Sequence, residues 1–240
     1  MQNKTVVLHE YAPPLRIGKL IKRYKRFLAD IEWPDGEIST VHCPNTGSML
    51  ACAGHNWPVA VSYHANPGRK YPWTLEMTHN GLGWIGIHTG RTNALVQRAI
   101  ESGSIKALQD HGAIRAEVRC GDNCRMDLMF HDSKQTPCWV EIKNVTLAQD
   151  GVFYFPDAVT TRGSKHIETL MRRCELGERG VLFFLIQHPA GEYFTVAEHI
   201  DAVFANNLRR AASVGVEIMA WQTIVSPSAI CLNRAIPVRL

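Results

Sequence analysis

Three residues near the middle of the chain have the types and spacing of a metal-dependent hydrolytic site. Glu141 and Lys143 stand in a mainly apolar run at residues 138–143, and Asp127 stands in an earlier apolar run at residues 125–129. Side chains of a strand alternate between its two faces, so Glu141 and Lys143 are expected to emerge together. A hairpin between the two strands would bring Asp127 beside Glu141.

This arrangement predicts a divalent metal ion and phosphodiester chemistry. Two carboxylates held close together repel each other, and a divalent cation removes that cost. Hard oxygen ligands suit Mg²⁺ or Mn²⁺, so Asp127 and Glu141 are the expected ligands. Such an ion polarises a phosphodiester and lowers the pKa of a bound water. Lys143 would orient that water or stabilise the developing charge, and Glu117, in the preceding strand-like run, is a candidate third carboxylate.

The same residues have a plainer interpretation. An acid-x-Lys triplet arises by chance about once in a chain of this composition, so the triplet alone predicts little. An exposed sheet face with an ordinary ion pair would contain one too. Glu117 lies between Arg115 and Arg119 and fits a solvated stripe. The weight of the nuclease interpretation therefore comes from the two apolar strands that carry Asp127 and Glu141.

Other kinds of site are weakly indicated or missing from the sequence. The chain has no P-loop GK[ST] motif and no Gly-x-Ser-x-Gly elbow. A zinc site would draw on cysteine and histidine side chains after residue 119, but their spacing lacks the CxxC pair of a zinc ribbon. Those side chains are Cys120, Cys124, His131 and Cys138.

Strand and helix patterns alternate from residue 89 onward. Apolar residues recur at helical spacing in some stretches, and strand-like runs lie between them. The uninterrupted apolar run at residues 181–186 is typical of a strand buried on both faces. The pattern predicts an α/β domain with a mixed sheet over residues 89–240. Helices are expected at residues 92–101, 162–176 and 202–212, and strands at 113–120, 125–131, 138–147, 181–187 and 216–221.

Residues 1–88 have a different texture. Short strand-like runs are separated by turn residues such as Pro34-Asp35-Gly36 and Asn80-Gly81, which favours short strands joined by tight turns. Their number and size fit an OB-like β-barrel. The strands are expected at residues 20–31, 39–43, 58–63, 74–78 and 84–88. The fold class is therefore a two-domain α+β or α/β protein, an N-terminal OB-like barrel followed by a mixed-sheet domain.

Basic residues suggest where nucleic acid would bind. The formal net charge is +4, and residues 1–83 hold nine Lys or Arg against six Asp or Glu. A charged groove with interleaved aromatic residues suits single-strand or non-specific DNA binding, whereas the alternative is a solvated strand with its apolar neighbours in the core. The barrel candidates are Lys22, Arg23, Lys25 and Arg26 around Tyr24 and Phe27, with Arg69 and Lys70 near Tyr71 and Trp73.

A third basic set lies on the helix expected at residues 162–176. Arg162, Lys165 and His166 would form a face for the phosphate backbone beside the metal site, although most charged helix faces are only solvated. The turn at residues 42–47 is also of interest, because Asn45 and Gly47 tolerate left-handed geometry. It would either approach a phosphate or simply join strands, and the sequence leaves both open.

The composition is that of an ordinary globular protein, with 45% hydrophobic and 20% charged residues. The longest apolar run is too short to span a bilayer, and residues 1–14 lack the apolar core of a signal peptide. Seven scattered cysteines without an export signal favour reduced thiols. The expected location is the cytoplasm, with no membrane partner.

Several segments resemble known families. Asp127 followed by Glu141-Ile142-Lys143 looks like the core of the PD-(D/E)XK nuclease superfamily, and nearly the whole chain resembles the sugar fermentation stimulation protein (SfsA) family. The resemblance implies an OB-like domain, a nuclease-like domain, DNA binding and a link to regulation of sugar (maltose) genes. The first dozen residues look longer than the family's usual start. The resemblance is carried by LIKRYKRFLAD at residues 20–30, HCPNTGSM at 42–49, RKYPWT at 69–74, VEIKNVTL at 140–147 and FPDAVTTRG at 155–163.

Two functional hypotheses follow. The leading one is a protein that binds DNA, with RNA as a further partner to consider, and that hydrolyses phosphodiesters with Mg²⁺ or Mn²⁺. The other is a non-catalytic DNA-binding regulator of sugar (maltose) utilisation genes. A ligand-sensing sugar regulator has no specific support, because no residue pattern resembles a sugar pocket. The sequence indicates neither strand preference nor oligomeric state.

Overall fold

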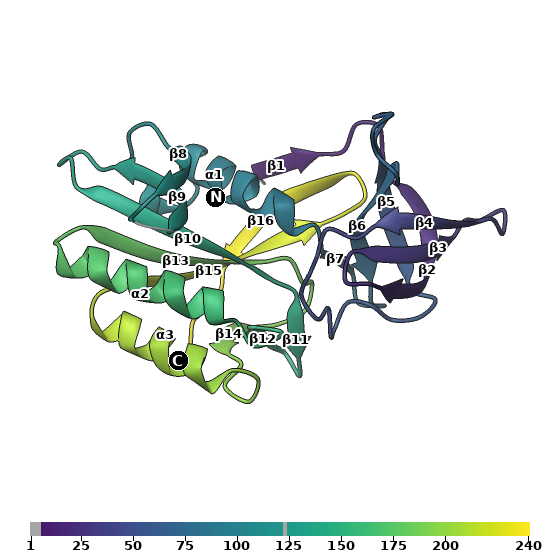
Figure 1. Ribbon diagram of the computed structural model, residues 1–240. Helices are drawn as coiled ribbons and strands as arrows, with labels where there is room; N and C mark the ends of the chain where they lie inside the picture. Colours follow the sequence, from purple (N-terminus) through teal and green to yellow (C-terminus); the bar gives the residue numbers. More distant parts are fainter. Residues whose placement is uncertain (1–5, 122–123) are drawn as a thin grey trace.

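Short strands with alternating apolar residues in the first part of the chain form a small closed barrel. The computed structural model describes residues 6–121 and 124–240, and the barrel lies at one end of it (Figure 1). The strand order is β4-β3-β2-β5-β6-β7, and β4 also pairs with β6 through His42 and Thr74, which closes the ring. The expected OB-like barrel is confirmed. Its strands are β2 (Arg16–Tyr24), β3 (Leu28–Glu32), β4 (Ile38–His42), β5 (Pro58–Tyr63), β6 (Trp73–His79) and β7 (Trp84–Gly86).

The strand expected at residues 20–31 is a hairpin instead. Strand β2 ends at Tyr24, β3 begins at Leu28, and the two pair antiparallel. Lys25 and Arg26 turn the chain with φ angles of 49° and 65°. This left-handed region is one that Gly or Asn usually marks in a sequence. Because neither residue type is present, the sequence gives no signal for the turn.

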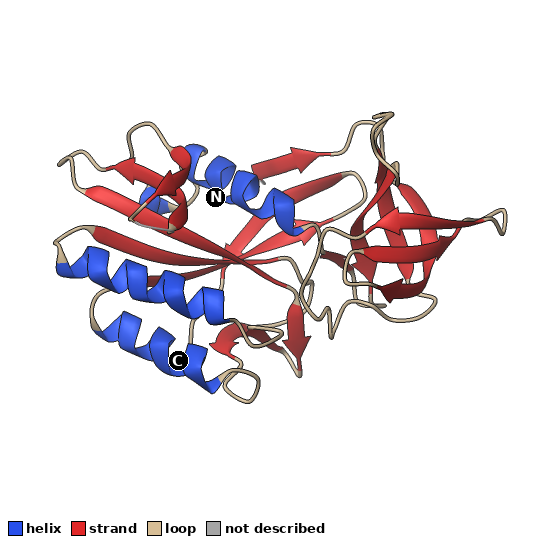
Figure 2. Ribbon diagram, viewed as in Figure 1, coloured by secondary structure: helices blue, strands red, loops and turns tan. Residues whose placement is uncertain are grey.

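The rest of the chain builds a seven-stranded mixed sheet in the order β1-β16-β15-β13-β10-β9-β8 (Figure 2). Its centre is parallel, and its outer strands pair antiparallel. Residues 181–186 of β13 are all 0% exposed, which confirms the expected strand with two buried faces. The strands are β1 (Val6–Glu10), β8 (Arg115–Arg119), β9 (Arg125–His131), β10 (Pro137–Val145), β13 (Arg179–Ile186), β15 (Glu217–Val225) and β16 (Ala229–Ala235).

Helices cover both faces of this sheet (Figure 1). Helix α1 (Thr92–Glu101) packs on one face, and α2 (Thr161–Glu175) and α3 (Ala202–Ser213) pack on the other. The Thr160 side chain accepts a hydrogen bond from Gly163 N at the start of α2, and Asp201 does the same for Phe204 N in α3. All three helices were expected at these places. None of the described helices is long and apolar enough to cross a membrane.

A small sheet lies between the ends of these helices and the barrel (Figure 1). It contains β11 (Leu147–Gln149), β12 (Val152–Phe155) and β14 (Tyr193–Val196). The sequence did not indicate β12, β14 or β16, because runs this short, or this polar, show no clear periodicity. Two short 3₁₀ turns, η1 (Thr89–Arg91) and η2 (Lys106–Leu108), flank α1.

The start of the chain belongs to the larger sheet and not to the barrel. Strand β1 (Val6–Glu10) pairs antiparallel with β16, and Leu8 is 0% exposed in the core beneath α1. The sequence assigned residues 1–88 to the barrel domain, of which residues 1–5 lie outside the described part. Pairing with β16 gives the backbone of β1 its hydrogen-bond partners and buries Leu8, so β1 is the edge strand of the larger sheet.

Candidate functional site

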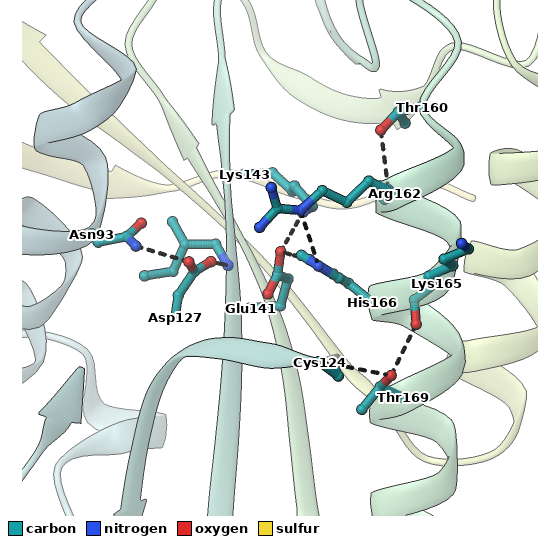
Figure 3. A network of polar contacts seen from close by, with 12 residues as sticks. Asn93, Cys124, Asp127, Glu141, Lys143, Thr160, Arg162, Lys165, His166 and Thr169 are labelled. Atoms are coloured by element: carbon teal, nitrogen blue, oxygen red, sulfur yellow. Dashed lines mark hydrogen bonds and ion pairs between the residues drawn. The ribbon is translucent and has the colours of Figure 1, made fainter. Parts of the chain in front are cut away.

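Asp127 lies where strand β9 leaves strand β10. The two strands pair as far as Leu128 opposite Val140. Just beyond that point the Asp127 carboxylate serves as the hydrogen-bond acceptor in place of a main-chain carbonyl. Its Oδ2 accepts a hydrogen bond from Ile142 N at 2.7 Å, and its Oδ1 accepts one from Asn93 Nδ2 at 2.8 Å. The carboxylate is therefore fixed from both the sheet and helix α1 (Figure 3).

Glu141 is 2% exposed, and its two oxygens differ. Lys143 Nζ and His166 Nδ1 both donate to Oε1 (Figure 3). Arg162 Nε donates to His166 Nε2 at 3.4 Å, so a neutral imidazole with its proton on Nδ1 fits both contacts. Oε2 is buried without a hydrogen-bond partner in the part of the chain that the structure describes. One oxygen of Glu141 thus has two donors, and the other has none among the described residues.

The two carboxylates have different protonation behaviour. Burial, and then the negative charge of Glu141, raise the pKa of Asp127 to about 6, against the opposing hydrogen bond from Ile142. Burial by itself would raise the pKa of Glu141 as well. The hydrogen bond from His166 and the charge of Lys143 outweigh burial and hold that pKa below its usual value. Carboxyl groups whose environments separate their pKa values in this way are typical of functional sites.

Asp127 and Glu141 offer oxygen ligands that fit a divalent cation. Mg²⁺ commonly takes one or two carboxylates and keeps several waters, so two acids are sufficient. The unpartnered Oε2 of Glu141 is the atom that such an ion would satisfy. Across residues 6–121 and 124–240, no three or more His, Cys, Asp or Glu side chains cluster as a metal site. The cysteines considered for zinc therefore have no built site there.

A cleft of about 410 Å³ opens beside Lys143, between the barrel and the larger domain. Asn45, Thr46 and Gly47 of the barrel line it on one side, and Lys143 and Arg162 are among the residues that line it on the other. The turn whose role the sequence left open thus faces Lys143, whereas Asp127 and Glu141 are not among the residues that line the cleft. A site shared by the two domains was not indicated by the sequence.

A larger hollow of about 1320 Å³ runs along helix α2. Arg162 lines both this hollow and the cleft, so positive charge continues from one to the other. We call the hollow the α2 groove; its basic and histidine residues are Arg119, Arg125, Arg162, Lys165, His166 and Arg172. The predicted helix residues Arg162, Lys165 and His166 therefore line one hollow, and His166 contacts Glu141.

Glu117 is more exposed than the half-buried Asp127 and the buried Glu141. Its side chain is 56% exposed and lies 3.6 Å from Arg125, while Asn93 Nδ2 approaches its Oε1 at 3.4 Å. Glu117 also has a φ of 54°, and it stands across from Asp127 in the β8–β9 register, between the pairs Ala116–Leu128 and Val118–Met126. Its exposure and its ion pair agree with the solvated interpretation.

Two of the predicted nucleic-acid residues in the barrel brace a loop. Arg23 Nη2 donates to the carbonyls of Asn45 at 2.8 Å and Gly47 at 2.9 Å. Arg26 Nη2 donates to the carbonyl of Thr46 at 3.2 Å. These guanidinium groups hold the turn that lines the cleft. Their role in the barrel is therefore at least partly structural.

The other basic residues of the barrel are less engaged. The Lys22 side chain is 64% exposed, with Nζ at 3.5 Å from Asp30, and Lys25 is exposed in the hairpin turn. Lys70 Nζ lies 5.5 Å from the Tyr71 ring. Arg69 donates to Thr74 Oγ1 at 2.9 Å. None of these residues lines the cleft beside Lys143.

Sequence reasoning missed Asn93 and Asp157. Asn93 fixes Asp127 from α1, and a single Asn in a helix carries no signal of that role. Asp157 follows the small sheet and holds the barrel loop: Ser48 Oγ donates to its main-chain oxygen at 2.6 Å, and Met49 N donates to its Oδ2 at 3.1 Å. The only hint was that Ser48 and Met49 lie in one segment, and Asp157 in another, that resemble the same family.

Comparisons with known proteins cover nearly the whole chain. The family model described as the sugar fermentation stimulation protein RE domain matches residues 90–229, and the SfsA N-terminal OB domain model matches residues 21–87. A sugar fermentation stimulation protein homolog from Shewanella sp. (strain W3-18-1) is 47% identical over 236 residues, which are 96% of this chain and 100% of that protein. The homolog from Pelobacter propionicus is 46% identical over 228 residues, which are 95% of this chain and 99% of that protein.

A solved structure is similar in fold. The structure of Pyrococcus furiosus SfsA in complex with Ca²⁺ has a TM-score of 0.89 to this chain at 23% identity, and the match covers 98% of this chain and 99% of that one. The barrel and the mixed-sheet domain are therefore shared, as is their arrangement.

Proposed function

The chain belongs to the sugar fermentation stimulation protein family. We propose that it hydrolyses phosphodiester bonds of nucleic acid with a divalent cation. The observation that carries the proposal is the free Oε2 of Glu141, which is buried without a hydrogen-bond partner among the described residues. An unpaired buried carboxylate oxygen is costly. A cation held together with Asp127 would remove that cost.

Asp127 and Glu141 would hold the cation. Their oxygens are the hard donors that Mg²⁺ and Mn²⁺ prefer. When bound, such an ion polarises a phosphodiester and lowers the pKa of a coordinated water. The Pyrococcus furiosus relative was solved in complex with Ca²⁺, which also takes oxygen ligands, and this supports a cation for the family member described here.

The surrounding side chains prepare the two acids. Lys143 and His166 both donate to Oε1 of Glu141, so its other oxygen is the one left for a ligand. Asn93 and the Ile142 N–H fix the two oxygens of Asp127. Lys143 also lines the cleft, where its ammonium would orient an attacking water or offset charge that develops on the phosphate.

The basic residues would bind the nucleic acid. The α2 groove begins at Arg162, beside the acids, and carries Lys165 and Arg172 further along the helix. Lys and Arg contacts to phosphates give affinity without sequence preference. We propose DNA as the partner on the resemblance of the family; RNA has the same phosphate chemistry and belongs in any test.

A second candidate is a DNA-binding regulator of sugar utilisation genes that does not cut. The contacts of Glu141 favour it, since the charge of this acid is already offset by Lys143 and its Oε1 is also held by His166. An acid satisfied in this way would need no cation to remain ionised. In that case the Asp127 and Glu141 pair would serve only the fold.

A nuclease panel separates the two candidates. The purified chain would be incubated with single-stranded, duplex and branched DNA and with RNA, in Mg²⁺, in Mn²⁺ or in chelator. Cleavage that requires the metal and is lost in Asp127→Asn supports hydrolysis. DNA binding with no cleavage of any substrate in either metal favours the regulator.

A further inference from the structure

The barrel segment at residues 44–49 covers one side of the cleft beside Lys143. We call this segment the roof. Asp157 accepts hydrogen bonds from Ser48 Oγ and Met49 N, and Thr89 Oγ1 donates to the Pro44 carbonyl at 2.9 Å. Both anchors lie outside the barrel strands, so the roof is tied to the larger domain at two points.

The roof is also held from within the barrel. Besides the Arg23 contacts to Asn45 and Gly47, the Asn45 Oδ1 accepts a hydrogen bond from Gly47 N at 2.8 Å. Asn45 itself is only 5% exposed. A Cβ at Gly47 would lie 2.9 Å from Asp157 Oδ2, so the two domains approach closely at this point. The roof is therefore held in a fixed position by hydrogen bonds from both domains.

The lining of the cleft includes cations, amide groups and aromatic rings, together with one carboxylate, that of Asp157, whose Oδ2 already accepts hydrogen bonds from Ser48 and Met49. Lys143 and Arg162 are cations, Asn93 and Asn144 carry amide groups, and Tyr154 adds an aromatic ring. The Tyr154 side chain is half-buried, and its ring makes a T-shaped contact with His199 at 5.7 Å between centroids, which fixes its orientation. Cations beside an aromatic ring are what a groove for unpaired nucleotides uses.

The size of the cleft limits what enters it. Its volume of about 410 Å³ is near the low end of the roughly 300 to 1,000 Å³ of sites that hold one small molecule. In a duplex, each base is covered on both faces by its neighbours, so enzymes that work on a base take it out of the stack or use a single strand. The Tyr154 ring is open only to a nucleotide that is unpaired.

We propose that the cleft takes one unpaired nucleotide of a single strand, with its base stacked on Tyr154 and its phosphate between Lys143 and Arg162. This inference rests on the proposed function, because it names the substrate class of the same site. The strand continues from Arg162 into the α2 groove, where Lys165 and Arg172 bind the next phosphates. The fixed roof at residues 44–49 keeps a duplex away from Lys143 and Arg162.

The test measures binding without cleavage. The Asp127→Asn chain would be titrated with single-stranded DNA, single-stranded RNA and duplex DNA of one sequence at one salt concentration, with fluorescence anisotropy as the readout. We expect both single strands to bind more tightly than the duplex. Tyr154→Ala in this background should weaken single-strand binding roughly ten-fold or more, whereas Tyr154→Phe keeps the ring and should keep the affinity. Tyr193→Ala, on the neighbouring strand β14 and outside the cleft, is the matched control.

A second pair of variants keeps the test informative if Tyr154→Ala fails to fold. Thr46 is exposed on the roof and lines the cleft, so Thr46→Glu places a negative charge opposite the phosphate. Leu50→Glu adds the same charge at a residue that is 68% exposed in the same loop but does not line the cleft. Only Thr46→Glu should weaken single-strand binding.

Two results would overturn the inference. One is a duplex that binds as tightly as the single strands, and the other is a pair of folded variants, Tyr154→Ala and Thr46→Glu, that bind single strands like the parent. Tighter binding of DNA or of RNA identifies which strand is used, and either supports the single-strand cleft. Failure of the unmodified chain to cut in Mg²⁺ or Mn²⁺ would instead overturn the hydrolysis, and it would leave these affinities unchanged.

Discussion

The main-chain N–H of Ile142 donates to Asp127 Oδ2 at 2.7 Å, which links one acid to the residue between Glu141 and Lys143. In a regular ladder this N–H would bond to a carbonyl of the neighbouring strand. Here β9 has already turned away, and the carboxylate takes the N–H instead. Strand β10 therefore sets the positions of all three groups at once, two through its side chains and one through its backbone.

Replacing Asp127 by Asn should abolish stabilisation by metal. In the wild type, Mg²⁺ or Mn²⁺ should raise the melting temperature, because the ion binds only the folded pair of acids; at a hundred times Kd the gain is about 2.7 kcal/mol. Asp127→Asn removes one charge and one ligand, so the gain should disappear. Thermal melts with and without metal measure it.

Glu117→Gln is the matched control for that experiment. The Glu117 side chain is exposed, pairs with Arg125 and shares the Asn93 amide with Asp127. This variant should keep the full metal-dependent shift in melting temperature. If Glu117→Gln lost the shift while Asp127→Asn kept it, our choice of metal ligands would be wrong.

Lys143→Ala should behave differently from Asp127→Asn. The ammonium is not a metal ligand, so the metal-dependent shift should survive, while turnover falls by roughly 10²- to 10³-fold, as for loss of a preorganised charge-stabilising group. Steady-state kinetics on the substrate found in the nuclease panel would show the loss in kcat. Lys165→Ala, a residue of the α2 groove further from the acids, should instead raise KM. Equal effects of the two variants on kcat would contradict these roles.

Arg23 and Lys22 should separate stability from binding. Arg23→Ala leaves the carbonyls of Asn45 and Gly47 without their donor, and we expect roughly 1 to 3 kcal/mol less stability in urea unfolding. Lys22→Ala should cost less than about 1 kcal/mol, because the Lys22 side chain in its ion pair with Asp30 is 64% exposed.

For Lys22→Ala the effect is expected on DNA binding. If Lys22 contacts a phosphate, its loss should lower the slope of log affinity against log salt by about one. A salt titration of the wild type and the variant checks this. An unchanged slope would show that Lys22 does not contact the bound DNA. Any contribution of the barrel to DNA binding would then come from the loop that Arg23 and Arg26 hold.

Acid should weaken the junction of the two domains through Glu76. Arg91 makes two hydrogen bonds to this buried carboxylate, at 2.6 and 2.7 Å. Burial alone would raise the pKa of Glu76, but the contacts with Arg91, His88 and Ser62 outweigh it and lower the pKa from its usual 4.5. A lowered pKa means that the ionised form stabilises the fold. This stabilisation is complete above 4.5 and is lost as the pH falls through the lower folded value.

The comparison of wild type with Glu76→Gln isolates that contribution. The variant leaves Arg91 without its charge partner, so at neutral pH we expect a loss of roughly 3 kcal/mol or more. The difference between the two proteins should shrink as the pH falls below 4.5. Urea unfolding over a pH series measures it, and a constant difference at all pH values would show that Glu76 does not titrate with folding.

Much of the fold could be predicted from local patterns. The run at residues 181–186 is apolar throughout, and it forms the buried centre of the sheet. The helix at residues 162–176 has both its apolar spacing and a Gly after its end, and α2 lies there. The hairpin turn at Lys25 and Arg26 could not be predicted, because left-handed geometry at Lys or Arg is decided by the pairing of the strands around it.

Only the charged residues at the centre of the candidate site were predicted from the sequence. Asp127, Glu141 and Lys143 lie on strands with strong apolar patterns, so their neighbourhood followed from strand pairing. The contacts of Asn93, Asp157 and the roof cross long distances in sequence. Such contacts depend on how the domains dock, and no periodicity within one segment reports that.

The pairing of β1 with β16 has a consequence for how the molecule can be divided. The barrel strands, β2 to β7, follow β1 and precede α1 in the chain. The barrel is therefore an insertion within the larger domain and not a separate domain that precedes it. Cutting the chain at the start of α1 would remove the barrel and also strip an edge strand from the sheet that carries Asp127 and Glu141. A barrel-free version would have to splice Glu10 to η1 through a new linker, and two attachments, instead of one, limit how far the barrel can swing.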